Sequence, residues 1–389
     1  MADNTVNGKT PKLVVLQLTG ANDYLNTVVP YTNPLYYDNR PNMHIPAEQV
    51  LQIDNEIGFN PNMQAVKRLY DEGKVAIIHS IGYPNPNYSH FRSMDIWYTC
   101  EPEKVSSEGW LGKVVRDLDP KGDNVLTAVN FGRGLPRALS LSGVPVASVA
   151  QLDTYGVLTG LSSATRSMAM ETFARLYSDD DAGDEVLRYM GQTGLDAQKG
   201  ADILRSAADK YTSTVKYPEG NPIAASLRGV AQTKLADLGT RIFYTAHGSF
   251  DTHASQMPMH AKLWKEVDGA IDAFFQDLRE HDAADDTIML LWTEFGRRVK
   301  ENGSGTDHGA GGVAFVIGEH VKGGQYGTYP SLRAEDLTQQ REGMFGNLRY
   351  SYDFRGLYSS IVDQWLGLDG PAIVGGKFEQ LAFVSRRAQ

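Results

Sequence analysis

The sequence predicts an α/β fold, a three-layer sandwich whose central, largely parallel sheet carries helices on both faces. Two observations predict it. Short apolar runs recur along the 389 residues, and long polar or helical stretches separate them. Apolar runs without alternation are typical of strands buried on both faces, and parallel strands need helical crossovers between them.

The expected strands are five runs rich in valine, isoleucine, leucine and aromatic residues. They lie at residues 12–18, 75–79, 241–246, 287–292 and 313–317. A helix is expected before the second strand, at about residues 63–72. A long amphipathic helix, at about 258–280, is expected between the third and fourth strands.

The middle of the chain, residues 163–238, has a different composition. It is rich in Ala, Leu, Met, Arg and Asp, with apolar residues at helical spacing, as in MAMETFARLY. We interpret it as a helical insertion over the sheet edge. The sequence shows no internal repeat, so the prediction is one domain over residues 1–389 that contains this insertion.

Composition limits the function classes. Hydrophobic residues make up 41% and charged residues 22%, as in ordinary globular proteins. The formal net charge of −10 argues against a nucleic-acid surface, which needs clustered Lys and Arg. A small anionic substrate held by a metal ion stays compatible with this charge, because the ion supplies its own local field.

The cysteine content limits the type of metal site, and the absence of long apolar segments indicates the compartment. Cys100 is the single cysteine, so neither an intramolecular disulfide nor a zinc site built on several thiolates can form. The chain shows no signal-peptide pattern and no run of ~18 apolar residues, as a membrane span requires. We expect no membrane partner and a cytoplasmic protein, or a periplasmic one if an export signal has been removed. Homo-oligomer formation stays open.

Polar residues gather where the expected strands end, which is where open α/β sheets bind ligands. Carboxylates and imidazoles are the ligands that hard and borderline divalent metals prefer. The sequence therefore predicts one or two divalent ions, with zinc first and magnesium, manganese or calcium as alternatives. The candidate metal ligands are Asp23, Asp251, His253, Glu294, Asp307 and His308.

Each candidate also has a structural interpretation. Asp23 could cap a turn, and the pair of Asp251 and His253 forms a DxH pattern that is common by chance. Glu294 follows an apolar strand directly, where a carboxylate needs a partner or a metal. Asp307 and His308 could lie in a solvated glycine-rich loop.

Three further residues are candidates for direct roles in catalysis. Ser89 follows a Pro- and Asn-rich turn and precedes an apparent helix, so it is either an N-cap or a nucleophile at the positive end of the helix dipole. Arg297 and Arg298, just past Glu294, could hold an anionic substrate by bidentate hydrogen bonds. A surface role is the alternative for one of them.

Several motifs carry a family resemblance. GANDYLNTVVPY, SHFRSMDIW, FDTH, TEFGRR, GTDHG and DFRGLYSSIVDQWLG resemble, over nearly the whole chain and in the same order, those of a large bacterial family, domain of unknown function 1501 (DUF1501). That family is similar in turn to the alkaline phosphatase and sulfatase superfamily. This likeness implies a metal-bearing α/β sandwich with a nucleophile at a helix start.

The resemblance also implies roles for individual residues. Asp23 resembles the carboxylate after the first strand, and Ser89 falls at the nucleophile position. The pair of Asp251 and His253, together with Glu294 and His308, resembles the superfamily's metal ligands. Two departures stand out. Phe295 follows Glu294 where a histidine ligand is usual, and Cys100 lies too far along its helix for a formylglycine-type sulfatase.

The predicted function is metal-dependent hydrolysis of a small phosphate or sulfate ester, with attack by Ser89 or by water. Two alternatives remain. One is phosphomutase or lyase chemistry on the same scaffold. The other is a non-catalytic protein that binds a ligand through a degenerate metal site.

Overall fold

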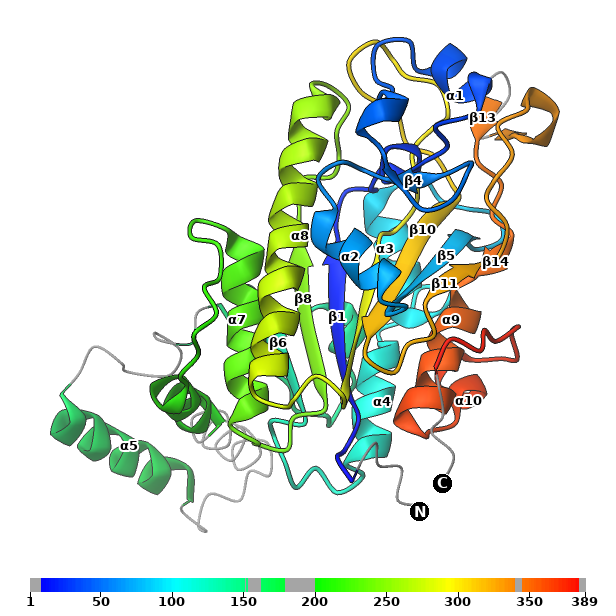
Figure 1. The fold of residues 1–389 in the computed structure, drawn as a ribbon. Helices are drawn as coiled ribbons and strands as arrows, with labels where there is room; N and C mark the ends of the chain where they lie inside the picture. Colours follow the sequence, from blue (N-terminus) through cyan, green and yellow to red (C-terminus); the bar gives the residue numbers. More distant parts are fainter. Residues whose placement is uncertain (1–7, 151, 153–161, 179–199, 340–344, 385–389) are drawn as a thin grey trace.

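The computed structural model describes residues 8–150, 152, 162–178, 200–339 and 345–384. A nine-stranded sheet runs through its centre in the order β11-β5-β10-β9-β1-β8-β6-β7, with β14 paired to β5 (Figure 1). The strands are β1 (Lys12–Leu18), β5 (Val75–Gly82), β6 (Ala128–Phe131), β7 (Ala147–Val149), β8 (Ile242–His247), β9 (Thr287–Trp292), β10 (Gly312–Gly318), β11 (Gly324–Tyr326) and β14 (Tyr352–Asp353).

Strand direction determines which loops meet. β1 pairs parallel with both β8 and β9. β10 is antiparallel to both β9 and β5, so β5 runs in the same direction as β1. The carboxyl ends of β1, β5, β8 and β9 therefore lie at one edge of the sheet, and β10 begins at that same edge. The predicted largely parallel sheet is confirmed, with β10 as the antiparallel member.

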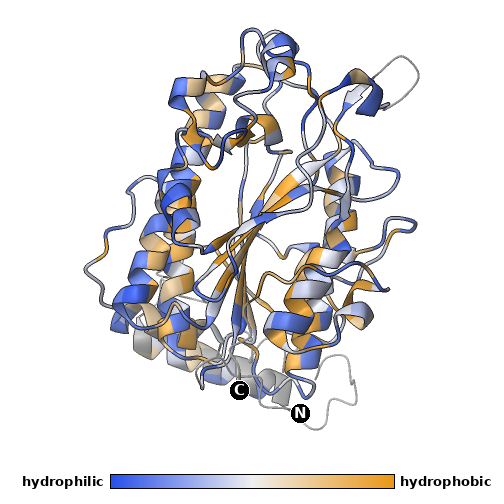
Figure 2. Ribbon diagram, turned by 45° about the vertical axis from the view of Figure 1, so that its right-hand side comes forward, coloured by the Kyte–Doolittle hydropathy of each residue, from blue (hydrophilic) through white to orange (hydrophobic). Residues whose placement is uncertain are grey.

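Helices cover both faces of the sheet (Figure 1). One layer holds α2 (Gln64–Asp71), α7 (Pro222–Leu235) and α8 (Gln256–Glu280), and the other holds α3 (His90–Thr99), α4 (Trp110–Leu118), α9 (Phe354–Ile361) and α10 (Gly370–Val374). Val14 and Leu16 of β1 face the first layer, whereas Leu13 and Val15 face the second. Figure 2 shows the resulting concentration of hydrophobic residues on the central strands. This alternation confirms the three-layer prediction.

All five expected strands and both expected helices are present, with bounds shifted by a few residues. The strands that the sequence did not indicate are short or lie at the periphery. They include β6, β7, β11 and β14 of the main sheet and a small sheet of β2 (Val28–Val29), β4 (Gly58–Phe59) and β3 (Leu51–Gln52). Near these lie α1 (Pro34–Asn39) and the pair β12 (Thr338–Gln339) and β13 (Phe345–Asn347). Runs of two to four residues carry too little periodicity to predict.

The expected insertion at residues 163–238 is mainly helical where it is described, with an irregular segment at residues 211–221. It contains α5 (Ser163–Ser178), a helix over residues 200–210, and α7. Leu227 and Val230 of α7 are fully buried, and α7 packs against α8 within the layer that covers the sheet. Residues 179–199 of the expected insertion lie outside the described residues. Among the described helices, none is both long and apolar enough to cross a membrane.

The N-terminus of helix α2 is capped by a carboxylate from another helix. Its N-cap residue, Met63, has no side chain that can accept a hydrogen bond. Asp268 of α8 takes this role, accepting from the backbone N–H groups of Ala65 and Val66 at 2.9 Å each. Because Asp268 is buried, no water can replace it at the start of α2.

Replacing Asp268 by alanine should therefore destabilise the fold. We expect Asp268→Ala to lower the free energy of unfolding by about 1–3 kcal/mol, the cost of leaving buried donors without an acceptor. Urea denaturation measures this. The matched control is Asp272→Ala, one turn further along α8, which removes a partly exposed ion pair with Arg68 and should cost at most about 1 kcal/mol. Equal losses would contradict the capping role.

Candidate metal centre

Three imidazoles and one carboxylate converge at the predicted edge of the sheet. The Nε2 atom of His308 lies 2.9 Å from Nε2 of His90, 3.0 Å from Nε2 of His253 and 3.2 Å from Oδ1 of Asp251. His90 is the first residue of α3, Asp251 and His253 follow β8, and His308 precedes β10. Segments more than 200 residues apart in the chain thus supply one cluster.

The spacing suits a divalent ion. One ligand atom from each of His90, Asp251 and His308 lies within 4.8 Å of the other two. The Nε2 atom of His253 adds a further donor at 3.0 Å from Oδ1 of Asp251. Zinc binds imidazole nitrogen and carboxylate oxygen at about 2.0–2.2 Å, so small shifts of these side chains would complete a coordination shell.

The opposite side of each imidazole ring faces an oxygen atom. Nδ1 of His90 lies 2.7 Å from Oε1 of Glu294, and Nδ1 of His308 lies 2.7 Å from the carbonyl oxygen of Tyr88. Nδ1 of His253 lies 3.4 Å from Oδ1 of Asp307. When Nδ1 carries the proton and donates it to such an acceptor, the Nε2 lone pair is free for a metal.

Electrostatics favours the protonation states that a metal needs at Asp251 and His308 but not at His90. Burial opposes ionisation of Asp251, but the hydrogen bond and charge of Arg297 outweigh it and lower its pKa to about 2. Burial lowers the pKa of His308, which keeps that ring neutral. The hydrogen bond to Glu294 raises the pKa of His90 against the effect of burial. A metal ion would therefore compete with a proton chiefly at His90.

Glu294, an expected metal ligand, lies behind His90. Its Oε1 atom also accepts from the backbone N–H of Gly20 at 2.8 Å, and its Oε2 atom accepts from the Thr293 hydroxyl at 3.1 Å. The Glu294 side chain is 0% exposed. In this arrangement Glu294 orients His90, and it reaches the cluster through that ring.

Gly20 must be glycine for this contact to form. Its φ of +112° lies in the region that favours glycine, and an added Cβ would come within 2.4 Å of the backbone nitrogen of Asp251. The turn after β1 can therefore approach both Glu294 and Asp251 only without a side chain. The loop after β1 is thus fixed against the loop after β8.

Asp23, another expected ligand, lies outside the cluster in a buried ion pair. The guanidinium of Arg40 donates to its Oδ1 atom at 2.9 Å and to its Oδ2 atom at 2.5 Å, and Nε2 of Gln256 donates to Oδ2 at 2.5 Å. Burial opposes ionisation, but Arg40 outweighs it and lowers the pKa of Asp23. Both oxygens are engaged, so Asp23 serves the scaffold in this structure.

Arg297, expected to hold the substrate, is fully buried and engaged within the protein. Its Nε atom donates to the carbonyl of Ala21 at 2.7 Å, and Nη1 donates to that of Thr306 at 3.0 Å. Its Nη2 atom reaches the carbonyls of Gly20 at 2.6 Å and Phe250 at 3.0 Å, and Oδ1 of Asp251 at 2.6 Å. Because these contacts occupy the guanidinium, Arg297 is unavailable to a substrate.

Ser89 and Arg298 lie beside the cluster. Ser89 is exposed at the N-cap of α3 and makes no side-chain capping hydrogen bond. Arg298 is partly exposed, and its charge acts on the nearby Tyr88. Their expected roles as nucleophile and anion-binding group stay predictions.

Asp307, expected as a ligand, sits at the outer rim. It is 47% exposed, and Nδ2 of Asn302 donates to its Oδ1 atom at 3.2 Å and to the carbonyl of His253 at 3.1 Å. Oδ1 of Asn302 in turn accepts from the N–H of Gly305 at 2.9 Å. Asn302 therefore holds the loop that carries Asp307 against His253.

Sequence reasoning assigned no site role to His90, Tyr88 or Asn302. His90 stands beside Ser89 in a segment that we singled out for its hydroxyl, and its place after the second strand was the signal that could have found it. Tyr88 contributes only a carbonyl oxygen, which carries no sequence signal. Asn302 acts through a loop contact that spacing cannot reveal.

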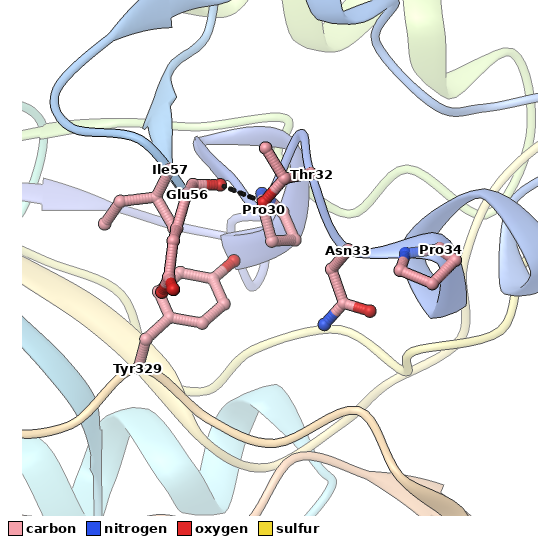
Figure 3. A pocket seen from close by; sticks show the side chains of 7 residues that line it. All are labelled: Pro30, Thr32, Asn33, Pro34, Glu56, Ile57 and Tyr329. Atoms are coloured by element: carbon pink, nitrogen blue, oxygen red, sulfur yellow. Dashed lines mark hydrogen bonds between the residues drawn. The ribbon is translucent and has the colours of Figure 1, made fainter.

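A separate hollow of about 270 Å³ lies near α1 (Figure 3). It is lined by Pro30, Thr32, Asn33, Pro34, Glu56, Ile57 and Tyr329, and none of the expected site residues is among them. Its single charged side chain is the Glu56 carboxylate, which would repel an anion. The hollow therefore has no part in the cluster of imidazoles at the sheet edge.

Solved structures similar to the chain share little sequence with it. A protein in the alkaline phosphatase superfamily from Vibrio parahaemolyticus is 10% identical with a TM-score of 0.39, covering 95% of this chain and 69% of that one. A sulfatase from a Pseudoalteromonas species is 14% identical with a TM-score of 0.40, covering 96% and 71%. An alkaline phosphatase from the Antarctic bacterium TAB5 is 12% identical with a TM-score of 0.35, covering 82% and 95%.

Sequence comparison identifies a family. No curated protein matches the chain. A family model described as "Protein of unknown function (DUF1501)" matches residues 10–343, a span that includes all the clustered side chains and the predicted motifs up to GTDHG. The chain therefore belongs to the DUF1501 family.

Proposed function

We propose that the chain is a metal-dependent hydrolase of a phosphate or sulfate ester. One observation carries the proposal: three Nε2 atoms and the Asp251 carboxylate converge, while each Nδ1 atom faces an oxygen. We assign His90, Asp251, His253 and His308 as the residues that would hold the ion. Glu294 and Asp307, expected as ligands, would instead orient the rings of His90 and His253.

The donor set favours zinc. Imidazoles combined with a single carboxylate suit zinc and other borderline metals, whereas magnesium and calcium prefer shells made of oxygen. When bound, a divalent ion polarises an ester oxygen and activates water. The side chains of the protein would position the ion, hold the ligands in the protonation states that bind it, and set the charge around it.

Local charge at the centre favours an anionic substrate. The charges of Asp251, Glu294 and Asp307 would offset those of Arg297 and a divalent ion, so the positive charge available to an anion comes from Arg298. The first-turn N–H groups of α3 start at His90, and the Ser89 side chain does not cap them. Arg298 adds a partly exposed cation nearby. Together these features suit the oxygens of a phosphate or sulfate group.

The centre is also open to a substrate. The side chains of Asp251 and His253 are 44% and 45% exposed. Structural zinc sites have closed shells, whereas catalytic sites leave a position free for water or substrate. This exposure favours hydrolysis over a purely structural ion.

Zinc binding should depend on Asp251 and not on Asp23. We expect Asp251→Asn to weaken zinc binding by more than the roughly 10–100-fold that loss of a residue orienting a ligand costs, and to abolish turnover of aryl phosphates and sulfates. Competition with a chromophoric chelator measures the affinity.

The matched control is Asp23→Asn, a second carboxylate paired with an arginine. It should destabilise the fold, because Arg40 would lose its buried counter-charge, yet leave the zinc affinity within about 2-fold of the original. Full turnover by Asp251→Asn, or equal loss of zinc from both variants, would contradict the proposed centre.

Water is the favoured nucleophile. In the described part of the chain, no base accepts a hydrogen bond from the Ser89 hydroxyl, so its activation would depend on the ion alone, whereas water can bind the ion in the open position of the centre. Ser89→Ala should therefore retain at least about half of the turnover of whichever aryl ester the protein hydrolyses. A loss of about 1,000-fold with zinc binding intact would assign the attack to Ser89 instead.

A further inference from the structure

We infer that Arg297 positions Asp251 as a metal ligand and limits the centre to a single metal ion. The inference rests on the proposed function, because it concerns the same centre. Its basis is the buried guanidinium, which binds four backbone carbonyls and Oδ1 of Asp251.

The two oxygens of Asp251 have different partners. Oδ1 accepts from Nη2 of Arg297 at 2.6 Å and also lies 3.0 Å from Nε2 of His253 and 3.2 Å from Nε2 of His308. Oδ2 lies 3.3 Å from Nε2 of His90. The short, charge-assisted bond ties Oδ1 to a guanidinium that cannot move, since its other donors are held by carbonyls. Arg297 therefore fixes the orientation in which the Asp251 carboxylate faces the imidazoles, so it would hold Asp251 in position as a ligand.

A second ion would need further anionic ligands within about 3.5–4 Å of the first ion. Both oxygens of Asp23 are bound by Arg40. Glu294 is 0% exposed and accepts from His90, Gly20 and Thr293. The remaining carboxylate, that of Asp307, lies at the outer rim beside His253.

Arg297 already neutralises the charge of Asp251, which a second metal ion would otherwise do. Because the guanidinium is always protonated, it would repel any additional ion that approached Oδ1 of Asp251. Asp23 and Asp251, two of the carboxylates that made a two-ion centre conceivable from sequence, are thus each paired with a buried arginine. The structure assigns one ion to this centre.

Metal stoichiometry tests the first half of the inference without any variant. The full-length protein is freed of metal by chelation, loaded with Zn²⁺ and then analysed by elemental analysis and titration calorimetry. We expect one Zn²⁺ per chain. Two ions per chain would overturn the inference, whereas no bound ion at all would instead refute the proposed function.

The second half is tested with Arg297→Lys and the matched variant Arg40→Lys. Both arginines are fully buried and pair with an aspartate, but only Arg297 contacts the proposed centre. Lysine keeps the charge and loses the fork that holds Oδ1 and the carbonyls together. We expect Arg297→Lys to weaken Zn²⁺ binding about 10–100-fold and to alter the visible spectrum of the Co²⁺-loaded protein.

Arg40→Lys should lower the melting temperature of the metal-free protein while leaving the Co²⁺ spectrum and the Zn²⁺ affinity unchanged. Unchanged affinity and spectrum in Arg297→Lys would overturn the positioning role. Equal weakening in both variants would also overturn it, because the loss would then follow from general destabilisation.

Discussion

The loops at the sheet edge meet around one buried cation, the guanidinium of Arg297. Backbone carbonyls of Gly20, Phe250 and Thr306 come from three different strand ends, and all three accept hydrogen bonds from it. An unpaired charge in this position would be strongly unfavourable. The guanidinium thus requires the loops to approach, and their carbonyls in turn require a donor that water cannot supply inside the protein.

A second buried arginine joins other segments near the same edge of the sheet. Arg40 pairs with Asp23 and also donates to the carbonyls of Val299 and Arg298. Gln256 connects this ion pair to the loop before β10, since it donates to Asp23 and accepts from the Thr306 hydroxyl at 2.6 Å. The polar groups of this buried ion pair are thus largely paired with one another, and the ion pair contacts none of the clustered imidazoles.

Much of the fold and part of the site could be predicted from sequence. The long apolar runs predicted the main strands, and the strand-end rule predicted that Asp251, His253 and His308 would lie at one edge. Asp23 and Glu294 met the same rule but have other partners. The rule cannot distinguish these cases, because a carboxylate that follows a strand has the same sequence pattern whether it faces a metal or an arginine. Arg40, which binds both oxygens of Asp23, lies in a segment whose sequence has no recognisable pattern.

The antiparallel course of β10 has a consequence for how the protein family can vary. Arg297 and His308 face each other across an antiparallel bridge, and backbone bonds join Arg298 to Asp307 and Gly296 to both Gly309 and Ala310. The anchoring arginine and a proposed ligand thus occupy opposite arms of one hairpin. Adding or deleting a residue within either arm would turn one of these side chains to the opposite face. Relatives that keep both residues should tolerate changes of length only at the tip, around Gly303.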